Sequence, residues 1–103
     1  MEYRFRLKEG KKTIPVITFE NPDFALAGEF LLAERSFLTE ILQALQEENG
    51  AFSGNAFSLE KRDNAAVISN DVTGVALTMD AQELTKLTED YRAEVRRCRK
   101  RKP

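Results

Sequence analysis

Hydrophobic and polar positions alternate at the start of the chain. Tyr3, Phe5 and Leu7 are separated by basic residues, which predicts a strand with these three side chains facing inward. A short polar turn and a β-branched run over 13–19 follow, so the first two strands are expected to form a hairpin. Pro15 has no amide proton to donate, so either the second strand is an edge strand or Pro15 lies where its amide would face solvent.

The longest helical pattern covers residues 21–50. Its apolar side chains recur every three or four positions, as on one face of a helix: Phe24, Ala27, Leu31, Leu38, Ile41, Leu42 and Leu45. Asn21 is expected to cap the first turn, and Gly50 to end the stretch in a left-handed conformation. Glu34 falls inside the apolar sector of a continuous helix. The stretch is therefore either one bent helix or two helices separated near Glu34, with Ser36 capping the second.

The remainder of the chain has the pattern of short strands followed by one helix. Runs over 56–61, 65–69 and 75–79 are separated by turn signals, which predicts an antiparallel meander. Asp80 is expected to cap the last helix. The buried stripe of that helix is expected to be Leu84, Leu87, Tyr91 and Val95. The predicted order is ββα(α)βββα: one α+β domain over 1–103, with helices packed on an antiparallel sheet of about five strands.

Charge is distributed unevenly, although the formal net charge is only −1. Residues 1–12 hold five basic and two acidic groups, and residues 92–103 hold seven basic and one acidic. Between them, residues 13–60 hold one basic group, Arg35, against eight acidic ones. An acidic middle and a basic, helical C-terminal end within one small domain predict two different faces.

Carboxylates on the outer side of the central stretch are the candidate binding residues. On a continuous helix Glu29, Glu40 and Glu47 lie opposite the apolar stripe. Ordinary exposed helices mix both signs of charge, so a nearly uncompensated acidic ridge is either a solvated face or a docking surface for a basic partner. The expected partner-binding residues are Asp23, Glu29, Glu40, Glu47 and Glu48.

Catalysis, cofactors and metals are not expected. The chain has no histidine, and its single cysteine, Cys98, cannot form an internal disulfide or build a zinc site alone. No glycine-rich phosphate loop and no calcium-site spacing is present. No apolar run is long enough to span a membrane, and the start lacks a signal-peptide pattern, so a cytoplasmic location is expected.

The basic C-terminal segment over 92–103 is open to two interpretations. Its cations complement the C-terminal dipole of the last helix, and one interpretation is a solvated helix end. Seven cations in twelve residues could also contact phosphates. Against this, the acidic remainder would repel a polyanion, so nucleic acid is expected to be the less favoured partner.

Two resemblances add to this picture. The opening, from Met1 to Phe5, and the closing helix around Tyr91 are similar in layout to the small YacL-like bacterial family. The segment over 52–59 and the hairpin through 67–70 resemble immunity proteins of bacterial contact-dependent growth inhibition and related polymorphic toxin systems. The latter resemblance implies a cytoplasmic, non-enzymatic α+β domain that binds a cognate toxin, often a basic nuclease.

The expected function is therefore inhibition of a cognate toxin by covering its active site or substrate groove. Carboxylates would replace nucleic-acid phosphates on the toxin's cations. Two alternatives stay open. One is a nucleic-acid accessory domain that uses the basic C-terminal segment, and the other is a housekeeping domain with a homo-oligomeric interface.

Overall fold

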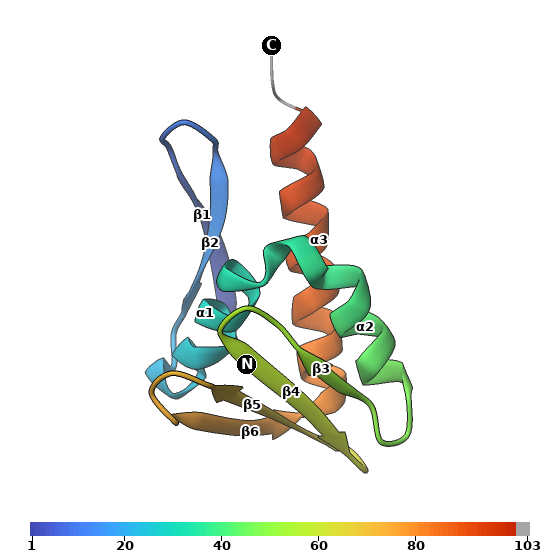
Figure 1. The fold of residues 1–103 in the computed structure, drawn as a ribbon. Coiled ribbons are helices and arrows are strands. Elements are labelled where there is room, and N and C mark those ends of the chain that lie inside the picture. The colour runs from blue at the N-terminus through green and yellow to red at the C-terminus, as the bar shows by residue number, and fades with distance from the viewer. Residues whose placement is uncertain (101–103) are drawn as a thin grey trace.

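The computed structural model describes residues 1–100, except the side chain of Lys100, and confirms an α+β fold of antiparallel strands and helices (Figure 1). The basic residues Arg101 and Lys102 lie outside the described part of the chain. The strands form two sheets, of two and four strands, so the expectation of one sheet of about five strands is wrong. The molecule is elongated, with principal extents of 43 × 26 × 26 Å.

The two-stranded sheet is the predicted hairpin of β1 (Tyr3–Lys8) and β2 (Ile14–Phe19). β2 pairs only with β1, which confirms that Pro15 lies in an edge strand. The inward side chains of Tyr3 and Phe5 are half-buried. Leu7 was expected inward but is 39% exposed, because it lies towards the tip of the hairpin, which extends away from the four-stranded sheet (Figure 1).

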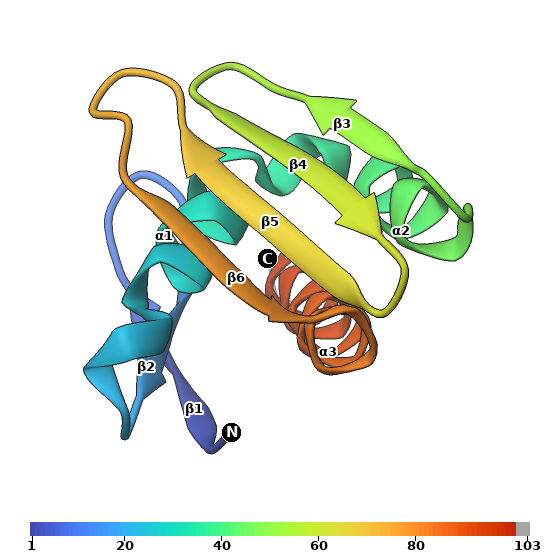
Figure 2. The same ribbon diagram turned by 90° about the horizontal axis from the view of Figure 1, so that it is seen from below.

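The central stretch begins with a 3₁₀ turn, η1 (Pro22–Phe24), and continues as α1 (Ala25–Ala33). Asn21 caps the turn as expected, since its side chain accepts a 2.9 Å hydrogen bond from the amide of Asp23. α1 lies between the hairpin and the second sheet and contacts both (Figure 2). Gly28 permits the close approach of the hairpin, because a Cβ there would lie 3.1 Å from the ring of Phe19.

A second 3₁₀ turn, η2 (Arg35–Phe37), separates α1 from α2 (Leu38–Gln46), so the central stretch is two helices. Ser36 does not cap α2, because the residue at the cap position is Phe37. The expected left-handed stop at Gly50 is also wrong: α2 ends at Gln46, and the left-handed glycine of the described chain is Gly74. Gly50 is instead required by packing, because a Cβ there would lie 1.8 Å from the carbonyl oxygen of Ala44.

The four-stranded sheet has its strands in sequence order: β3 (Ala51–Ser53), β4 (Phe57–Arg62), β5 (Ala65–Asn70) and β6 (Ala76–Asp80). Antiparallel pairing throughout confirms the predicted meander. β3 was not predicted, and it adds an edge strand beside β4. The inner face supplies Phe57, Leu59, Ala66, Ile68 and Met79 to the core.

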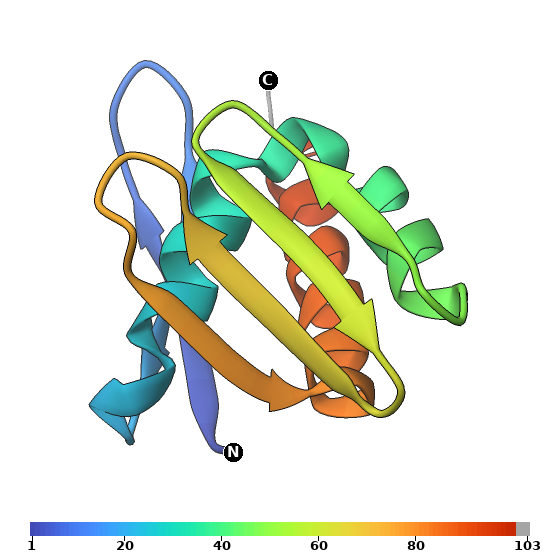
Figure 3. The same ribbon diagram turned by 60° about the horizontal axis from the view of Figure 1, so that its bottom comes forward.

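The last helix, α3 (Ala81–Lys100), follows β6 directly. Asp80 caps it as expected, since its side chain accepts a 3.0 Å hydrogen bond from the amide of Glu83. The predicted stripe of Leu84, Leu87, Tyr91 and Val95 is buried. One face of the four-stranded sheet is therefore covered by α1, α2 and α3, while the other face is open (Figures 2 and 3).

Candidate functional site

Glu34, at the break between α1 and α2, is the only buried charged residue in the described part of the chain. Its Oε1 accepts a 2.8 Å hydrogen bond from the amide of Asn55, and its Oε2 accepts from the amides of Ala56 (2.9 Å) and Phe57 (3.0 Å). Three backbone donors thus replace the water that a buried carboxylate loses. Glu34 is a structural residue and is not available to a partner.

The same break divides the predicted acidic ridge between different elements. Asp23 lies in η1, and Glu29 lies on α1, where it lines a groove between that helix and β2. Glu40 is in the first turn of α2, and Glu47 directly follows its last residue. The structure therefore brings these carboxylates to the surface but does not align all of them on one helix.

Three of the five predicted binding residues belong to α2 or directly follow it. Glu40, Glu47 and Glu48, on or directly after α2, are exposed and form what we call the α2 acidic face. The ion pairs described for residues 1–99 join Arg62 to Glu60, Lys86 to Asp90 and Arg97 to Glu94. Within those residues, then, no cation lies within ion-pair distance of the α2 acidic face, Asp23 or Glu29.

Basic side chains from both ends of the chain come together at the end of the molecule that lies away from the C-terminal end of α2. The tip of the β1–β2 hairpin and the C-terminal end of α3 both lie there, away from the end of α2 (Figure 1). The cations that line the grooves between the hairpin, η2 and α3 form what we call the basic end: Lys8, Lys11, Lys12, Arg35, Arg92, Arg96 and Arg99. Within residues 1–99 none of these seven forms an ion pair, and Glu9 is the one acidic residue lining the same grooves.

Arg35 is the residue at which these grooves meet, since it lines all three. One groove, of about 160 Å³, runs between the hairpin and α3 past Lys12 and Arg99. A second, of about 100 Å³, runs between η2 and α3 past Arg92 and Arg96. The half-buried Arg35 is held in place because its Nη1 donates a 2.8 Å hydrogen bond to the carbonyl of Leu32.

The positive charge of Arg35 also acts on Tyr91, which is buried in the core. Burial raises the pKa of Tyr91 to about 12, and the nearby Arg35 guanidinium acts against that rise. The hydroxyl of Tyr91 donates a 2.8 Å hydrogen bond to the carbonyl of Pro15, which fastens α3 to the hairpin. The hairpin and α3, which line the two sides of the 160 Å³ groove, are therefore linked by this hydrogen bond.

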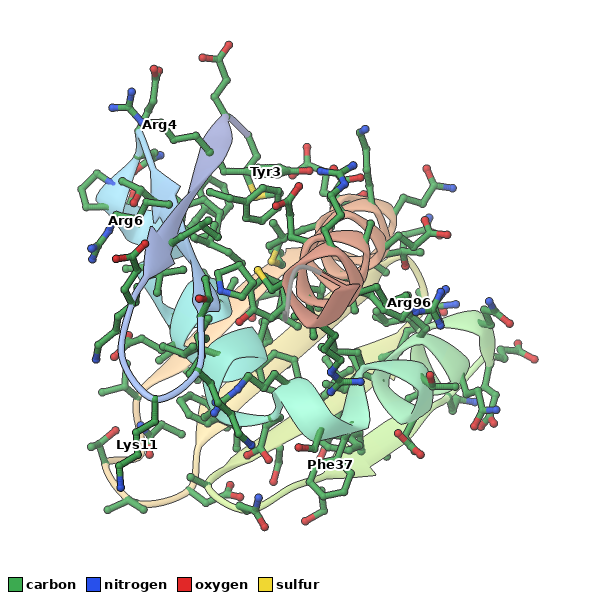
Figure 4. The ribbon with its side chains drawn as sticks, turned by 90° about the horizontal axis from the view of Figure 1, so that it is seen from above. Tyr3, Arg4, Arg6, Lys11, Phe37 and Arg96 are labelled. Carbon is green, nitrogen blue, oxygen red and sulfur yellow. The ribbon has the colours of Figure 1, made fainter. Side chains whose placement is uncertain are left out.

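Figure 4 looks along α3 onto the basic end. Lys11 on the hairpin and Arg96 on α3 lie on either side of the segment that carries Phe37. Arg4 and Arg6 point away from α3 on the outer side of β1, so the cations continue around the hairpin. The sequence showed both basic segments but not their meeting, and the isolated Arg35 in an acidic region was the signal that could have indicated it.

The features described so far are charged surfaces. In the described residues no group of three or more histidine, cysteine or acidic side chains could hold a metal ion. Cys98 is buried, only 6% exposed, on the inner side of α3. No helix within residues 1–100 combines the length and the apolar character needed to cross a membrane.

Comparison of the chain with protein families, with curated proteins and with solved structures finds no match. What the molecule does must therefore be argued from the α2 acidic face and the basic end.

Proposed function

We propose that this protein is a non-enzymatic inhibitor, an immunity protein that binds and neutralises a cationic nuclease toxin in the cytoplasm of the cell that makes both. The observation that carries the proposal is the α2 acidic face: Glu40, Glu47 and Glu48 are exposed and have no ion-pair partner within residues 1–99. A substrate groove that binds nucleic acid is lined by cations, and such a groove is complementary to this face.

Two of the carboxylates occupy an unfavourable position. Glu47 caps the C-terminus of α2, and Glu48 follows it, where the helix dipole is negative. A carboxylate there loses some stability, whereas Glu40 in the first turn gains some. Retaining negative charge at an unfavourable position is understandable if a partner uses it.

The helix that presents this face is firmly anchored. Its opposite side buries Leu38, Ile41, Leu42, Ala44 and Leu45 against α3, β3 and β4. The backbone positions of the carboxylates are thus fixed before binding, which reduces the entropy lost on association. Asp23 and Glu29 lie on η1 and α1, which Figure 2 shows apart from α2, so the proposed interface rests on Glu40, Glu47 and Glu48.

The inhibitor mechanism is occlusion. Carboxylates of the α2 acidic face take the places of substrate phosphates on the toxin's lysines and arginines. Long-range attraction speeds the encounter, and pairs that lose water at the interface become strongly coupled. No residue of the inhibitor has to react.

The test compares two triple charge reversals with the same change in net charge. Glu40→Lys, Glu47→Lys and Glu48→Lys alter the α2 acidic face, whereas Glu2→Lys, Glu20→Lys and Glu89→Lys alter other exposed acidic positions. Each variant is titrated against the nuclease domain encoded beside this chain's gene, with RNA cleavage as the readout. The first triple variant is expected to lose inhibition by at least about a hundredfold, since each coupled pair contributes more than a tenfold effect. Equal inhibition by both folded variants would refute the proposal.

A further inference from the structure

We propose that the basic end is a second binding site, which holds the phosphodiester backbone of a single-stranded nucleic acid. The inference is independent of the inhibitor function, because none of the five predicted acidic binding residues lines the three basic grooves. It also assigns a role to the hairpin cations as well as to those of α3.

The concentration of positive charge favours an anionic ligand. Seven cations line the connected grooves, with Glu9 as the one carboxylate among the described lining residues. Protein surfaces usually intersperse charges of both signs, because like charges repel. An anion in the grooves would remove this repulsion and release condensed counterions from the nucleic acid, which favours binding.

The shape of the site favours a flexible strand over a rigid duplex. The groove between the hairpin and α3 encloses only about 160 Å³, and the half-buried Arg35 lines it together with Lys12 and Arg99. A single strand can bend one phosphate towards Arg35 while its neighbours contact the exposed cations on either side. The guanidinium group can bind two phosphate oxygens at once, and the hydrogen bond from Arg35 to Leu32 already fixes its orientation.

The acidic remainder of the chain does not prevent this binding. Glu40 follows Thr39, which lines the 100 Å³ groove, but Glu47 and Glu48 lie at the end of α2 that points away from the hairpin tip (Figure 1). Charges in salt solution are screened over about 8 Å at physiological ionic strength. A strand at the basic end is therefore largely screened from the carboxylates that follow α2.

The experiment measures the fluorescence anisotropy of a labelled single-stranded RNA mixed with the full chain at several salt concentrations. Three phosphate contacts, at Lys12, Arg35 and Arg99, predict that the logarithm of the association constant falls with the logarithm of salt with a slope of about −2. The double variant Lys12→Glu and Arg99→Glu is expected to bind at least about tenfold more weakly, with a slope smaller by about 1.4.

The matched control is Arg62→Glu with Lys86→Glu, which changes the net charge equally on β4 and the N-terminal half of α3. It is expected to retain binding within about twofold. All four positions are exposed, so neither variant should unfold the chain. No binding by the native chain at low salt, or equal losses in both variants, would overturn the inference.

Competition identifies the ligand. Inorganic phosphate and poly-glutamate are added at the charge concentration of the bound RNA, and neither is expected to displace it. Displacement by phosphate would indicate a site for a small anion, and displacement by poly-glutamate would indicate a site for an acidic polypeptide. Either result would refute the nucleic-acid assignment. The variant Lys12→Glu with Arg99→Glu is expected to inhibit the toxin as well as the native chain does. A negative result for RNA binding therefore does not affect the inhibitor proposal, which has its own test.

Discussion

The carboxylate of Glu34 lies so close to Gly54 that a Cβ on residue 54 would be 2.4 Å from the Cδ atom of Glu34. The pair joins the α1–α2 break to the turn between β3 and β4, because the amides of the next three residues donate to the same carboxylate. The absent side chain at Gly54 is what permits this approach. This connection fixes the position from which α2 begins.

Replacing Glu34 by Gln is expected to destabilise the fold although the side chain keeps its length. One carboxylate oxygen becomes an NH₂ group, which faces backbone N–H donors and cannot accept from them. Leaving a buried donor without an acceptor costs about 1–3 kcal/mol, and more when the lost group was charged. Urea unfolding followed by circular dichroism should show a free energy of unfolding lower by about 2–4 kcal/mol. A change below the error of the measurement would mean that water satisfies these amides.

Gly54→Ala should have a similar effect by a different route. The new methyl group would overlap the Glu34 carboxylate and displace it from its three donors. Gly10→Ala is the matched control, because a Cβ at Gly10 would meet no atom within 4 Å. We expect Gly54→Ala to lower the free energy of unfolding by about 2 kcal/mol or more, and Gly10→Ala to leave it within about 0.5 kcal/mol. Equal stabilities would contradict the packing described here.

These residues show what could be predicted from the sequence. The misfit of Glu34 in the apolar stripe correctly indicated a break as one of two alternatives, because helical periodicity is a local property. Its hydrogen-bond partners could not be predicted, since the amides of 55–57 converge only once β3 and β4 have paired. β3 itself has three residues, Ala51–Ser53, too few to show an alternating pattern.

Hydrophobic periodicity also could not predict how the strands pair into sheets or which charged segments come together. Alternation predicted the strand observed at Tyr3–Lys8, and the β-branched run over 13–19 predicted the strand observed at Ile14–Phe19. Neither pattern encodes whether their hairpin joins the other strands in one sheet. The helical wheel placed Glu29 and Glu40 on one ridge because it assumed one axis. The basic end was missed for a related reason, since Lys12, Arg35 and Arg99 meet only through tertiary packing.

Tyr91→Phe should loosen the attachment of α3 to the hairpin. The hydroxyl donates to the carbonyl of Pro15 in a buried position, so its removal leaves that carbonyl without its partner. The expected loss is about 1–3 kcal/mol of unfolding free energy at neutral pH. This loss is measured by comparing thermal and urea unfolding of the variant with that of the native chain. An unchanged midpoint would show that this hydrogen bond contributes nothing.

The same substitution should change the response of the protein to alkaline pH. Burial raises the pKa of Tyr91 to about 12, and burial together with a hydrogen bond to Asp90 raises that of Tyr3 to about 12. The folded chain thus holds both protons more tightly than the unfolded chain, whose tyrosines titrate near pH 10. This stability is complete below pH 10 and is lost as the pH rises towards 12. Tyr91→Phe should weaken that decline in a series of urea unfolding curves, and an identical decline in both proteins would contradict the assignment.

Removing negative charge after α2 should make the chain more stable and a poorer inhibitor. Glu47→Gln with Glu48→Gln relieves repulsion between neighbouring carboxylates and their unfavourable interaction with the helix dipole. We expect a gain of about 0.3–1 kcal/mol in the free energy of unfolding at low salt, falling as salt is added. Glu40→Gln is the control, because a carboxylate in the first turn is favourable and its loss should lower stability slightly. If Glu47→Gln with Glu48→Gln instead destabilises the fold, these carboxylates are structural, and their retention no longer supports a partner. If the variant is more stable and still inhibits fully, the charge does not serve binding, and the inhibitor proposal loses its physical basis.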